Sequence, residues 1–264
     1  EKTQAPMGDG RVNMQAPAIS VTNLSVAFFG RTILDGITTD VPGNSITMII
    51  GPSGSGKTTL LRAVNRLNEE FAGCSNSGAV RIEVSGRMVD IYSDLPLSKL
   101  RRVAGMVFQS PNVFPLSIRK NLLAPLKVMH SLSRSQRHER MEQALKEAEL
   151  WDEVCDRLDD SALTLSGGQQ QRLCLARVLA LSPRILLLDE PTASLDVRSA
   201  AKIEELLMKL KERYTILAVS HSIRQVKRIA DRAVILSAGQ MIKTLERKQL
   251  ETPGLLEELV DEIF

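Results

Sequence analysis

The sequence predicts an α/β protein with a mostly parallel sheet and helices on the faces of that sheet. Two observations lead to this prediction. Short, nearly all-apolar runs recur along the chain, the first at Ile46–Ile50, as in strands that are buried on both faces of a sheet. Segments with the apolar spacing of helices separate most of these runs. With 264 residues, the chain can hold one large α/β unit and a smaller added subdomain.

The first part of the chain reads mainly as strands. Residues 1–18 are polar and show no period, so we expect a disordered tail there. A helix is expected over residues 58–67, and a Ser-Gly turn inside residues 80–92 predicts a hairpin in a small N-terminal antiparallel β subdomain. The expected strands cover residues 19–26, 33–41, 46–50, 80–84, 88–92 and 103–108.

Residues 111–161 have a different character, because the strand pattern stops there. Apolar residues from Met141 to Leu158 recur with helical spacing among charged residues, which predicts helical structure over residues 134–158. We therefore expect an inserted helical subdomain over residues 111–161.

The rest of the chain returns to alternating strands and helices. The expected helices cover residues 168–181, 199–213 and 223–230, and the expected strands cover residues 185–188, 215–219 and 233–236. Residues 253–264 predict a short acidic amphipathic helix.

Composition excludes several classes of protein. Lys and Arg number 34 against 31 Asp and Glu, and they are dispersed, so we expect no nucleic-acid partner. No run approaches the 18 or so apolar residues of a membrane span, so any work at a membrane would need other subunits to do the spanning. The three cysteines lie far apart without a CxxC pair, which argues against a structural zinc site or a disulfide framework.

Residues 51–58, directly after the first apolar run, match the phosphate-binding pattern GxxxxGK[ST] in full. Glycines allow successive backbone N–H groups to turn toward an anion, and the following helix N-terminus adds partial positive charge. Lys57 would reach the outer phosphates of a nucleotide, and the Thr58 hydroxyl would bind Mg²⁺. The alternative is a chance glycine-rich turn. The expected strand before the loop and the expected helix after it favour the phosphate-binding loop, because a chance turn needs neither. The candidate nucleotide-binding residues are Gly51, Pro52, Ser53, Gly54, Ser55, Gly56, Lys57, Thr58 and Thr59.

Two carboxylates, Asp189 and Glu190, follow a second apolar strand at the end where open α/β sheets bind their ligands. We expect Asp189 to hold Mg²⁺ through its water shell and Glu190 to polarise the water that attacks the γ-phosphate. Alone, such a pair could be solvated turn residues. Downstream of a phosphate-binding loop, it indicates nucleotide hydrolysis.

Residues 165–169, Leu-Ser-Gly-Gly-Gln, form a second glycine turn that leads into a helix. One γ-phosphate does not need two such cradles from one subunit, so the second is expected to serve the nucleotide of a partner. Here the sequence resembles the ATP-binding cassette (ABC) ATPases over about residues 19–245, a family with this signature and with sites between two head-to-tail subunits. The resemblance implies a homodimer around two ATP-Mg sites. The signature residues at the partner's nucleotide would be Ser166, Gly167, Gly168 and Gln169.

The resemblance also implies a domain organisation. Residues 19–110 and 162–245 would form a RecA-like P-loop NTPase core with the antiparallel β subdomain. Residues 111–161 would form the helical signature subdomain, and residues 246–264 a C-terminal helix.

Four further positions match the family's motifs. Gln109, at the end of the strand over 103–108, matches the glutamine that contacts Mg²⁺ and the attacking water. His221 matches the histidine that senses the γ-phosphate, although a lone histidine is more often a neutral surface or core residue. Asp196 matches the aspartate of the D-loop, which acts across the dimer interface. Phe29 matches the aromatic residue that stacks on adenine, and Phe28 is its rival because only one of two successive strand residues faces the ligand.

Because exporters commonly fuse the cassette to membrane spans, the chain resembles the stand-alone ATPase subunits of bacterial importers. Phrases at residues 64–68, 105–118 and 165–174 are closest to the phosphate-import ATPases. This implies a peripheral ATPase at the cytoplasmic face of the plasma membrane, with permease subunits docking near Pro111, Phe114, Pro115 and Leu116. A periplasmic or extracellular solute-binding protein would be an indirect partner.

Departures from the family pattern leave an alternative open. Ser222 stands where the family usually has Asn, and Val197 where it usually has Pro. An importer of another oxyanion, a metal or an amino acid is therefore the alternative to phosphate, and the ATPase itself does not touch the solute.

Other classes fit the sequence less well. A DNA-repair cassette would carry a long coiled coil between Gln109 and the signature, and a translation-factor cassette would hold two cassettes in one chain. A P-loop kinase would lack the signature and need an acceptor pocket. A binding module without turnover would lack Glu190.

Overall fold

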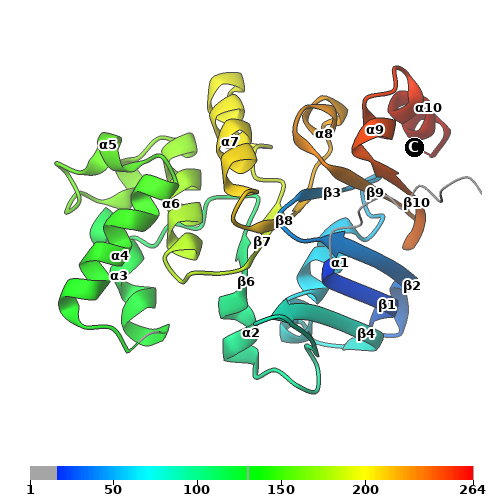
Figure 1. Ribbon diagram of the computed structural model, residues 1–264, viewed down its shortest axis with the longest axis horizontal. Coiled ribbons are helices and arrows are strands. Elements are labelled where there is room, and N and C mark those ends of the chain that lie inside the picture. The colour runs from blue at the N-terminus through cyan, green and yellow to red at the C-terminus, as the bar shows by residue number, and fades with distance from the viewer. Residues whose placement is uncertain (1–16, 130, 264) are drawn as a thin grey trace, which may run out of the picture.

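The chain is organised around a six-stranded sheet (Figure 1). Its strands are β3 (Ile46–Ile50), β6 (Ala104–Val107), β7 (Ile185–Asp189), β8 (Thr215–Val219), β9 (Arg232–Ser237) and β10 (Gln240–Glu246). The strand order is β10-β9-β3-β8-β7-β6, in which β10 is antiparallel to β9 and the other neighbours are parallel. The predicted α/β fold with a mostly parallel sheet is confirmed. The computed structural model describes residues 17–129 and 131–263.

A second sheet is antiparallel throughout, with the order β2-β1-β4-β5. Its strands are β1 (Pro17–Phe28), β2 (Arg31–Pro42), β4 (Cys74–Val84) and β5 (Arg87–Asp90). The predicted tail is wrong at its last two residues, because Pro17 pairs with Pro42 and Ala18 is buried in this sheet. Residues 1–16 of that prediction lie outside the described residues.

Helices connect and flank the strands. They are α1 (Lys57–Ala63), α2 (Leu97–Val103), α3 (Ile118–Met129), α4 (Arg134–Glu147), α5 (Trp151–Val154), α6 (Gly167–Leu179), α7 (Val197–Leu210), α8 (Ile223–Ile229), α9 (Arg247–Leu250) and α10 (Leu255–Ile263). Short 3₁₀ turns lie at Leu67–Glu70 and Ala162–Thr164. Among the residues described, no helix is long and apolar enough to cross a membrane.

Alternate residues of the central strands face opposite sides of the six-stranded sheet, as the pleat requires. In β3, Met48 and Ile50 join one apolar cluster, whereas Ile49 joins another. The first cluster contains apolar side chains of α6, α7 and α8, and the second contains those of α1 and the antiparallel sheet. Burial on both faces explains why these strands are apolar at nearly every position.

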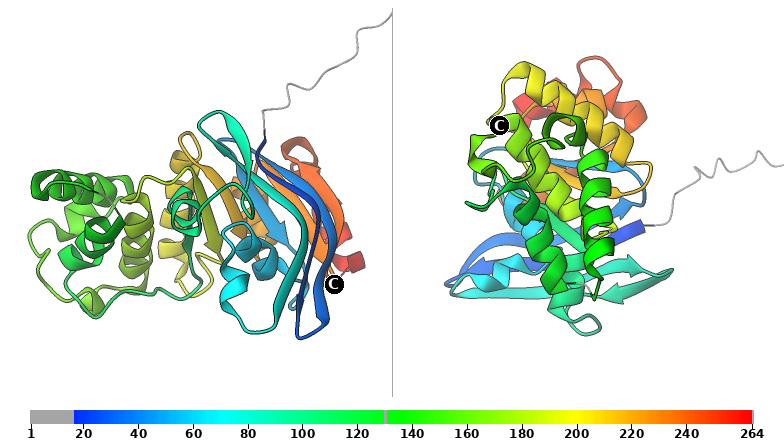
Figure 2. Two further views of the ribbon diagram at one scale, coloured as in Figure 1. Left: turned by 90° about the horizontal axis from the view of Figure 1, so that it is seen from below. Right: turned by 90° about the vertical axis from the view of Figure 1, so that its left-hand side faces the viewer.

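Helices α3 to α6 lie at one end of the molecule and the antiparallel sheet at the other (Figure 2). The two ends of the inserted stretch meet, because Ser117 and Ser161 form an antiparallel bridge. The backbone N–H of Ile118 also donates to Asp160, and that of Ala162 to Leu116. The insert therefore leaves the core and returns to it through one narrow connection.

The helical stripe predicted over residues 134–158 is divided between two helices, because the chain turns between α4 and α5. Glu149 has a left-handed backbone, with φ of 50°. Its N–H donates to Lys146 O at 3.0 Å, and Leu150 N–H donates to Leu145 O at 2.9 Å. This is the hydrogen-bond pattern of a Schellman helix end. A glycine usually marks such an end, and its absence hid the break.

Smaller differences concern the ends of elements. The predicted helix over 58–67 ends at Ala63, because Arg66 has a left-handed backbone with φ of 58°. The predicted strand over 103–108 loses Val103 to α2, and Phe108 lies beyond its end. Strand β10 was not predicted. One C-terminal helix was predicted over residues 246–264, and the structure has two short helices there, α9 and α10.

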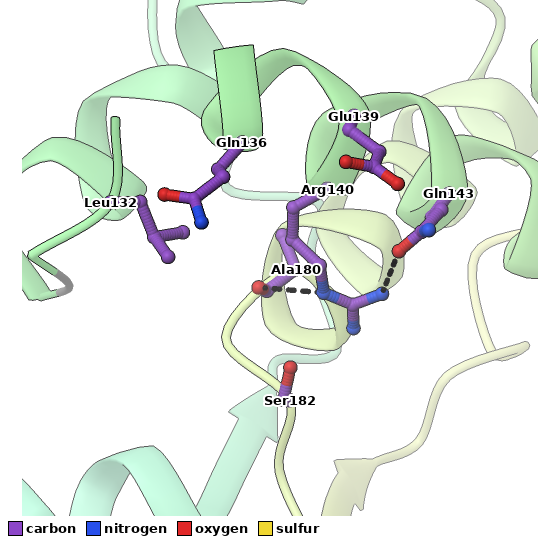
Figure 3. Close-up of a pocket in the computed structure, with 7 residues that line it drawn as sticks. All are labelled: Leu132, Gln136, Glu139, Arg140, Gln143, Ala180 and Ser182. Carbon is purple, nitrogen blue, oxygen red and sulfur yellow. Dashed lines mark hydrogen bonds between the residues drawn. The ribbon is translucent and has the colours of Figure 1, made fainter. Parts of the chain in front are cut away.

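Polar contacts hold α4 against the core near the end of α6. The Arg140 guanidinium donates to Ala180 O at 3.2 Å and also to Leu179 O, so it caps the carbonyl end of α6. Figure 3 shows Arg140 at the centre of this contact, beside a cavity of about 270 Å³. Glu147 pairs with Arg140 at 3.3 Å and accepts a 2.7 Å hydrogen bond from the Tyr214 hydroxyl. One carboxylate thus joins the insert to the residue just before β8.

Tyr214 gives this contact a measurable pH dependence. Burial, followed by the hydrogen bond to Glu147, raises the pKa of Tyr214 to about 12, against about 10 in an unfolded chain. A raised pKa in the folded state means that this contribution to stability is complete below about pH 10. It is lost as the pH rises from about 10 to about 12.

We expect Tyr214→Phe to lower the free energy of unfolding at pH 8 by about 1.5–3 kcal/mol, because Glu147 loses a donor. The difference from wild type should shrink between pH 10 and pH 12. Urea unfolding of both proteins at pH 8 and pH 11 measures it. A difference that stays constant over this range would contradict the expected pH dependence.

Candidate nucleotide site

The loop over residues 51–56 links the end of β3 to the start of α1 and sits against β9. A Cβ built on Gly51 would lie 2.1 Å from the backbone oxygen of Leu236, so only glycine allows this close approach. Gly54 has a left-handed φ of 80°, and a Cβ there would meet nothing within 4 Å. The loop is therefore tightly packed at its base and open at its tip.

Lys57 is buried at the start of α1 and turns back over the loop. Its ammonium group donates to Gly51 O and Pro52 O, both at 2.8 Å. Burial lowers the pKa of Lys57, and the nearby carboxylates of Glu190 and Asp189 oppose this shift by raising it. The loop thus encloses a cation at the place where the sequence predicts phosphates.

Oxygen atoms of Thr58 and Asp189 meet beside this lysine. The Thr58 hydroxyl donates to Asp189 Oδ1 at 2.9 Å, although the two residues are 131 positions apart. Asp189 is buried, and the Arg62 guanidinium lies 4.0 Å from its other carboxylate oxygen. Hydroxyl and carboxylate oxygens are suitable ligands for Mg²⁺, which usually takes few protein ligands and fills the rest with water and phosphate.

Glu190, directly after β7, connects the other predicted catalytic residues. Gln109 Nε2 donates to Glu190 Oε2 at 3.1 Å, and His221 Nε2 lies 2.5 Å from Glu190 Oε1. Glu190 itself has a left-handed backbone, with φ of 46°. A cavity of about 290 Å³ opens beside Glu190 and His221. The structure therefore brings Gln109, Glu190 and His221 into one cluster at the end of the sheet.

The signature turn lies elsewhere, at the N-terminus of α6. The Ser166 hydroxyl accepts from Gln169 N–H, and Gln169 Oε1 accepts from Ser166 N–H, which together make a capping box. Gly168 packs closely against Ser199, since a Cβ there would lie 2.9 Å from the Ser199 hydroxyl. Helices α6 and α1 lie apart along the long axis of the molecule (Figures 1 and 2). The two predicted phosphate cradles of one chain therefore do not meet.

Asp196 caps the N-terminus of α7. Its carboxylate accepts from Arg198 N–H at 3.0 Å, from Ser199 N–H at 3.1 Å and from the Ser199 hydroxyl at 2.6 Å. These bonds, that of the Ser199 hydroxyl first, hold the pKa of Asp196 below its usual range. The D-loop carboxylate is thus engaged within its own chain.

The two candidate aromatic residues for adenine have different environments. Phe29 is 80% exposed, and its backbone N–H donates to Gly73 O at 2.9 Å. The Phe28 ring packs edge-on against Phe71, with ring centroids 6.4 Å apart. Phe29 is therefore the one with a free ring face.

Comparison with known proteins agrees with this geometry. The ABC transporter family matches residues 34–193, more than half of the chain. The chain belongs to this family. The predicted ABC ATPase fold is thereby confirmed.

Two curated relatives align with nearly the whole of this chain. One is phosphate import ATP-binding protein PstB 2 of Mycobacterium tuberculosis, 42% identical over 95% of this chain and 89% of its own length. The other is phosphate import ATP-binding protein PstB 2 of Streptococcus thermophilus, 45% identical over 90% of this chain and 93% of its own length.

Two solved ABC structures share the fold. CbiO1 of Clostridium perfringens, part of the transporter complex cbiONQ, has a TM-score of 0.77 and 27% identity, with 93% of this chain and 95% of that chain covered. The ATP-binding cassette MJ0796, a dimer in a post-hydrolysis state with ADP and Pi, has a TM-score of 0.71 and 30% identity. The match covers 87% of this chain and 98% of that one.

The structure also shows polar residues around the ABC site that the sequence did not reveal. Gln225 is buried, accepts from the Ser220 hydroxyl at 2.6 Å and donates to Thr192 at 3.0 Å. Gln171 in α6 donates to Phe108 O at 3.2 Å, next to Gln109. Gln225 lies in ordinary helical sequence, where no motif distinguishes it from a surface residue. Gln171 lies within the phrase at residues 165–174, but that phrase does not indicate its contact with Phe108.

Two glycines of the loop provide a matched pair for testing its packing. We expect Gly51→Ala to cost about 3 kcal/mol of unfolding free energy, because the new methyl group would overlap the Leu236 carbonyl. Gly54→Ala should cost about 1–2 kcal/mol, the strain of a left-handed backbone in open space. Thermal unfolding of both variants measures the difference. Equal losses of unfolding free energy in the two variants would show that close packing against Leu236 does not set the requirement for glycine at position 51.

Proposed function

We propose that the chain is the ATP-hydrolysing subunit of a bacterial importer of inorganic phosphate. The cluster of Gln109, Glu190 and His221 beside the Lys57 loop carries the proposal of ATP hydrolysis. Relatives named as phosphate import proteins at 41–45% identity over at least 90% of the chain support phosphate as the solute. An importer of another solute finds no such support.

In this proposal, the 51–59 loop binds the phosphates of ATP. Lys57 would exchange its bonds with the loop carbonyls for the outer phosphates, which gives its charge a better partner than a neutral carbonyl. The exposed ring of Phe29 would stack on adenine. Thr58 would hold Mg²⁺ through its hydroxyl oxygen, Asp189 through the water shell of the ion, and Gln109 through its amide oxygen. When bound, Mg²⁺ neutralises part of the charge on the phosphate oxygens.

Glu190 is the proposed general base. Its two carboxylate oxygens face Gln109 and His221, so a water bonded to Glu190 would also lie near these two side chains. Glu190 would polarise that water, Gln109 would orient it, and His221 would sense the γ-phosphate. To contact the γ-phosphate through Nε2, His221 would have to release Glu190.

Each complete site would contain two chains. The Lys57 loop of one chain and the turn of Ser166 in the same chain lie apart, so a nucleotide bound at the first can reach the second only in a partner. The dimeric structures of the cassette MJ0796, 30–31% identical to this chain, support the association of two chains. Asp196 would act across the same interface.

The proposed contact with the permease lies on residues 111–116. Phe114 and Leu116 are 42% and 41% exposed, which is unfavourable for large apolar side chains without a partner. Asn121 holds this loop, since it accepts from Phe114 N–H at 2.8 Å and donates to Phe114 O at 3.2 Å. The Arg177 guanidinium lies 4.4 Å from the centre of the Phe114 ring. A cytoplasmic helix of a permease would cover this patch.

This docking would place the chain at the cytoplasmic face of the plasma membrane. A periplasmic or extracellular phosphate-binding protein would deliver the solute to the permease from the opposite side.

The shared site is tested by Glu190→Gln. The amide retains the shape of the side chain but cannot act as a base, so the variant should bind ATP and hydrolyse it at least about 100-fold more slowly. Size-exclusion chromatography with ATP should then show a stable dimer, which the wild type forms only briefly. A variant that stays monomeric with its nucleotide site saturated would rule out the proposed sandwich.

The docking patch is tested by Phe114→Asp. We expect phosphate uptake and permease association to be lost, because a charge would enter an apolar contact. Basal ATPase activity of the isolated subunit should persist, since the nucleotide site is unchanged. The assay compares phosphate uptake by cells that carry the wild-type subunit with uptake by cells that carry Phe114→Asp. Wild-type uptake by a folded Phe114→Asp transporter would refute the docking site.

A further inference from the structure

A carboxylate of the helical insert, Glu153 in α5, contacts the signature turn. Its Oε2 accepts a 2.8 Å hydrogen bond from Gln169 Nε2. The same carboxylate forms a two-bond pair with Arg172, at 2.9 Å and 3.0 Å. Both donors lie in the first turns of α6, so one side chain of α5 holds the beginning of the signature helix.

The contact with Glu153 fixes the orientation of the Gln169 amide. A glutamine amide has a donor end and an acceptor end, and it can turn over when both ends are free. Here Nε2 is held by Glu153, so Oε1 faces the backbone of Ser166 and accepts its N–H at 2.9 Å. The Ser166 backbone is thereby held at the cap of α6, with the N–H groups of Gly167 and Gly168 following it at the helix N-terminus.

The negative charge of Glu153 is compensated by Arg172. The side chain of Arg172 is only 8% exposed, and it additionally donates to Glu149 O. The hydrogen bond from Arg172, followed by that from Gln169, holds the pKa of Glu153 below its usual range. Glu153 therefore stays ionised at neutral pH, and its pairing with Arg172 reduces its repulsion of a phosphate near the turn.

We infer that Glu153 is a positioning residue for the signature turn, which acts through Gln169 and not by contact with nucleotide. It keeps the Ser166 turn in the form that receives the γ-phosphate of ATP bound to a partner chain. This role rests on the proposed shared site. Because α5 belongs to the insert, Glu153 also makes the shape of the turn depend on how the insert is packed.

The experiment uses the full chain with Glu190→Gln as the parent, and measures the ATP concentration that gives half-maximal dimerisation. In Glu153→Ala, Gln169 loses its hydrogen bond to a charged carboxylate at both nucleotide sites of the dimer. This loss should raise the ATP concentration for half-maximal dimerisation about tenfold or more. ADP affinity of the same variant should change less than about twofold, since its own Lys57 loop is intact. Asp152→Ala is the matched control, because Asp152 is the exposed acidic neighbour in α5, and it should behave as the parent.

A double-mutant comparison separates positioning through Gln169 from other effects. In a Gln169→Ala background, Glu153→Ala should raise the ATP requirement less than about twofold, because the contact it supports is already missing. A full additional tenfold effect there would overturn the role through Gln169. An unchanged ATP requirement in Glu153→Ala alone would overturn it as well.

The inference stays testable if Glu153→Ala does not fold because Arg172 is left buried and unpaired. Glu153→Ala combined with Arg172→Met removes both charges and should fold, since replacing a buried pair with apolar groups is often neutral. The folded double variant should show the same tenfold effect, and a wild-type ATP requirement would refute the inference. A Glu190→Gln parent that fails to dimerise would instead refute the shared site itself, and the Glu153 role with it.

Discussion

The functional cluster depends on the parallel register of the six-stranded sheet. In that register Ile49 of β3 and Asp189 of β7 both pair with Val219 of β8, and Val107 of β6 pairs with Leu188 of β7. The carboxyl ends of four strands therefore lie side by side, and the residues that follow them meet. Contacts such as that between Gln109 and Glu190, 81 positions apart, follow from this alignment. An antiparallel neighbour would have sent one of these ends to the opposite edge.

Helix starts provide a second common feature. Ser166, Asp196 and Ser222 are each the N-cap of a helix, and each side chain accepts a backbone N–H of the first turn. In each case, the hydrogen bonds that begin the helix also fix a turn that the family motifs single out. Such turns need little additional structure to hold their shape, because capping is a local interaction. Their placement relative to one another still depends on how the helices pack.

The helical insert differs from the core in how it is attached. Apolar side chains of the insert continue the cluster that covers one face of the sheet, and specific polar contacts add to this attachment. Glu147 joins α4 to Tyr214 at the base of β8, and Glu153 joins α5 to the start of α6. Glu153 bonds to the first turns of α6, and Glu147 pairs with Arg140, which donates to carbonyl groups at the other end of this helix. Side chains of the insert therefore contact α6 at both of its ends. The packing of the insert and the position of the signature turn are therefore physically linked.

The sequence by itself determined much of this protein. Strands such as Ile46–Ile50 and Thr215–Val219 could be located because burial on both faces leaves continuous apolar runs, and the loop from Gly51 could be located because its geometry requires glycine. The tertiary structure alone decided the rest. It ended α4 at Glu147, with the left-handed Glu149 in place of a glycine. It also placed Glu153 on Gln169, because packing between segments that are distant along the chain decides which contacts form, and no local pattern of residues records that packing.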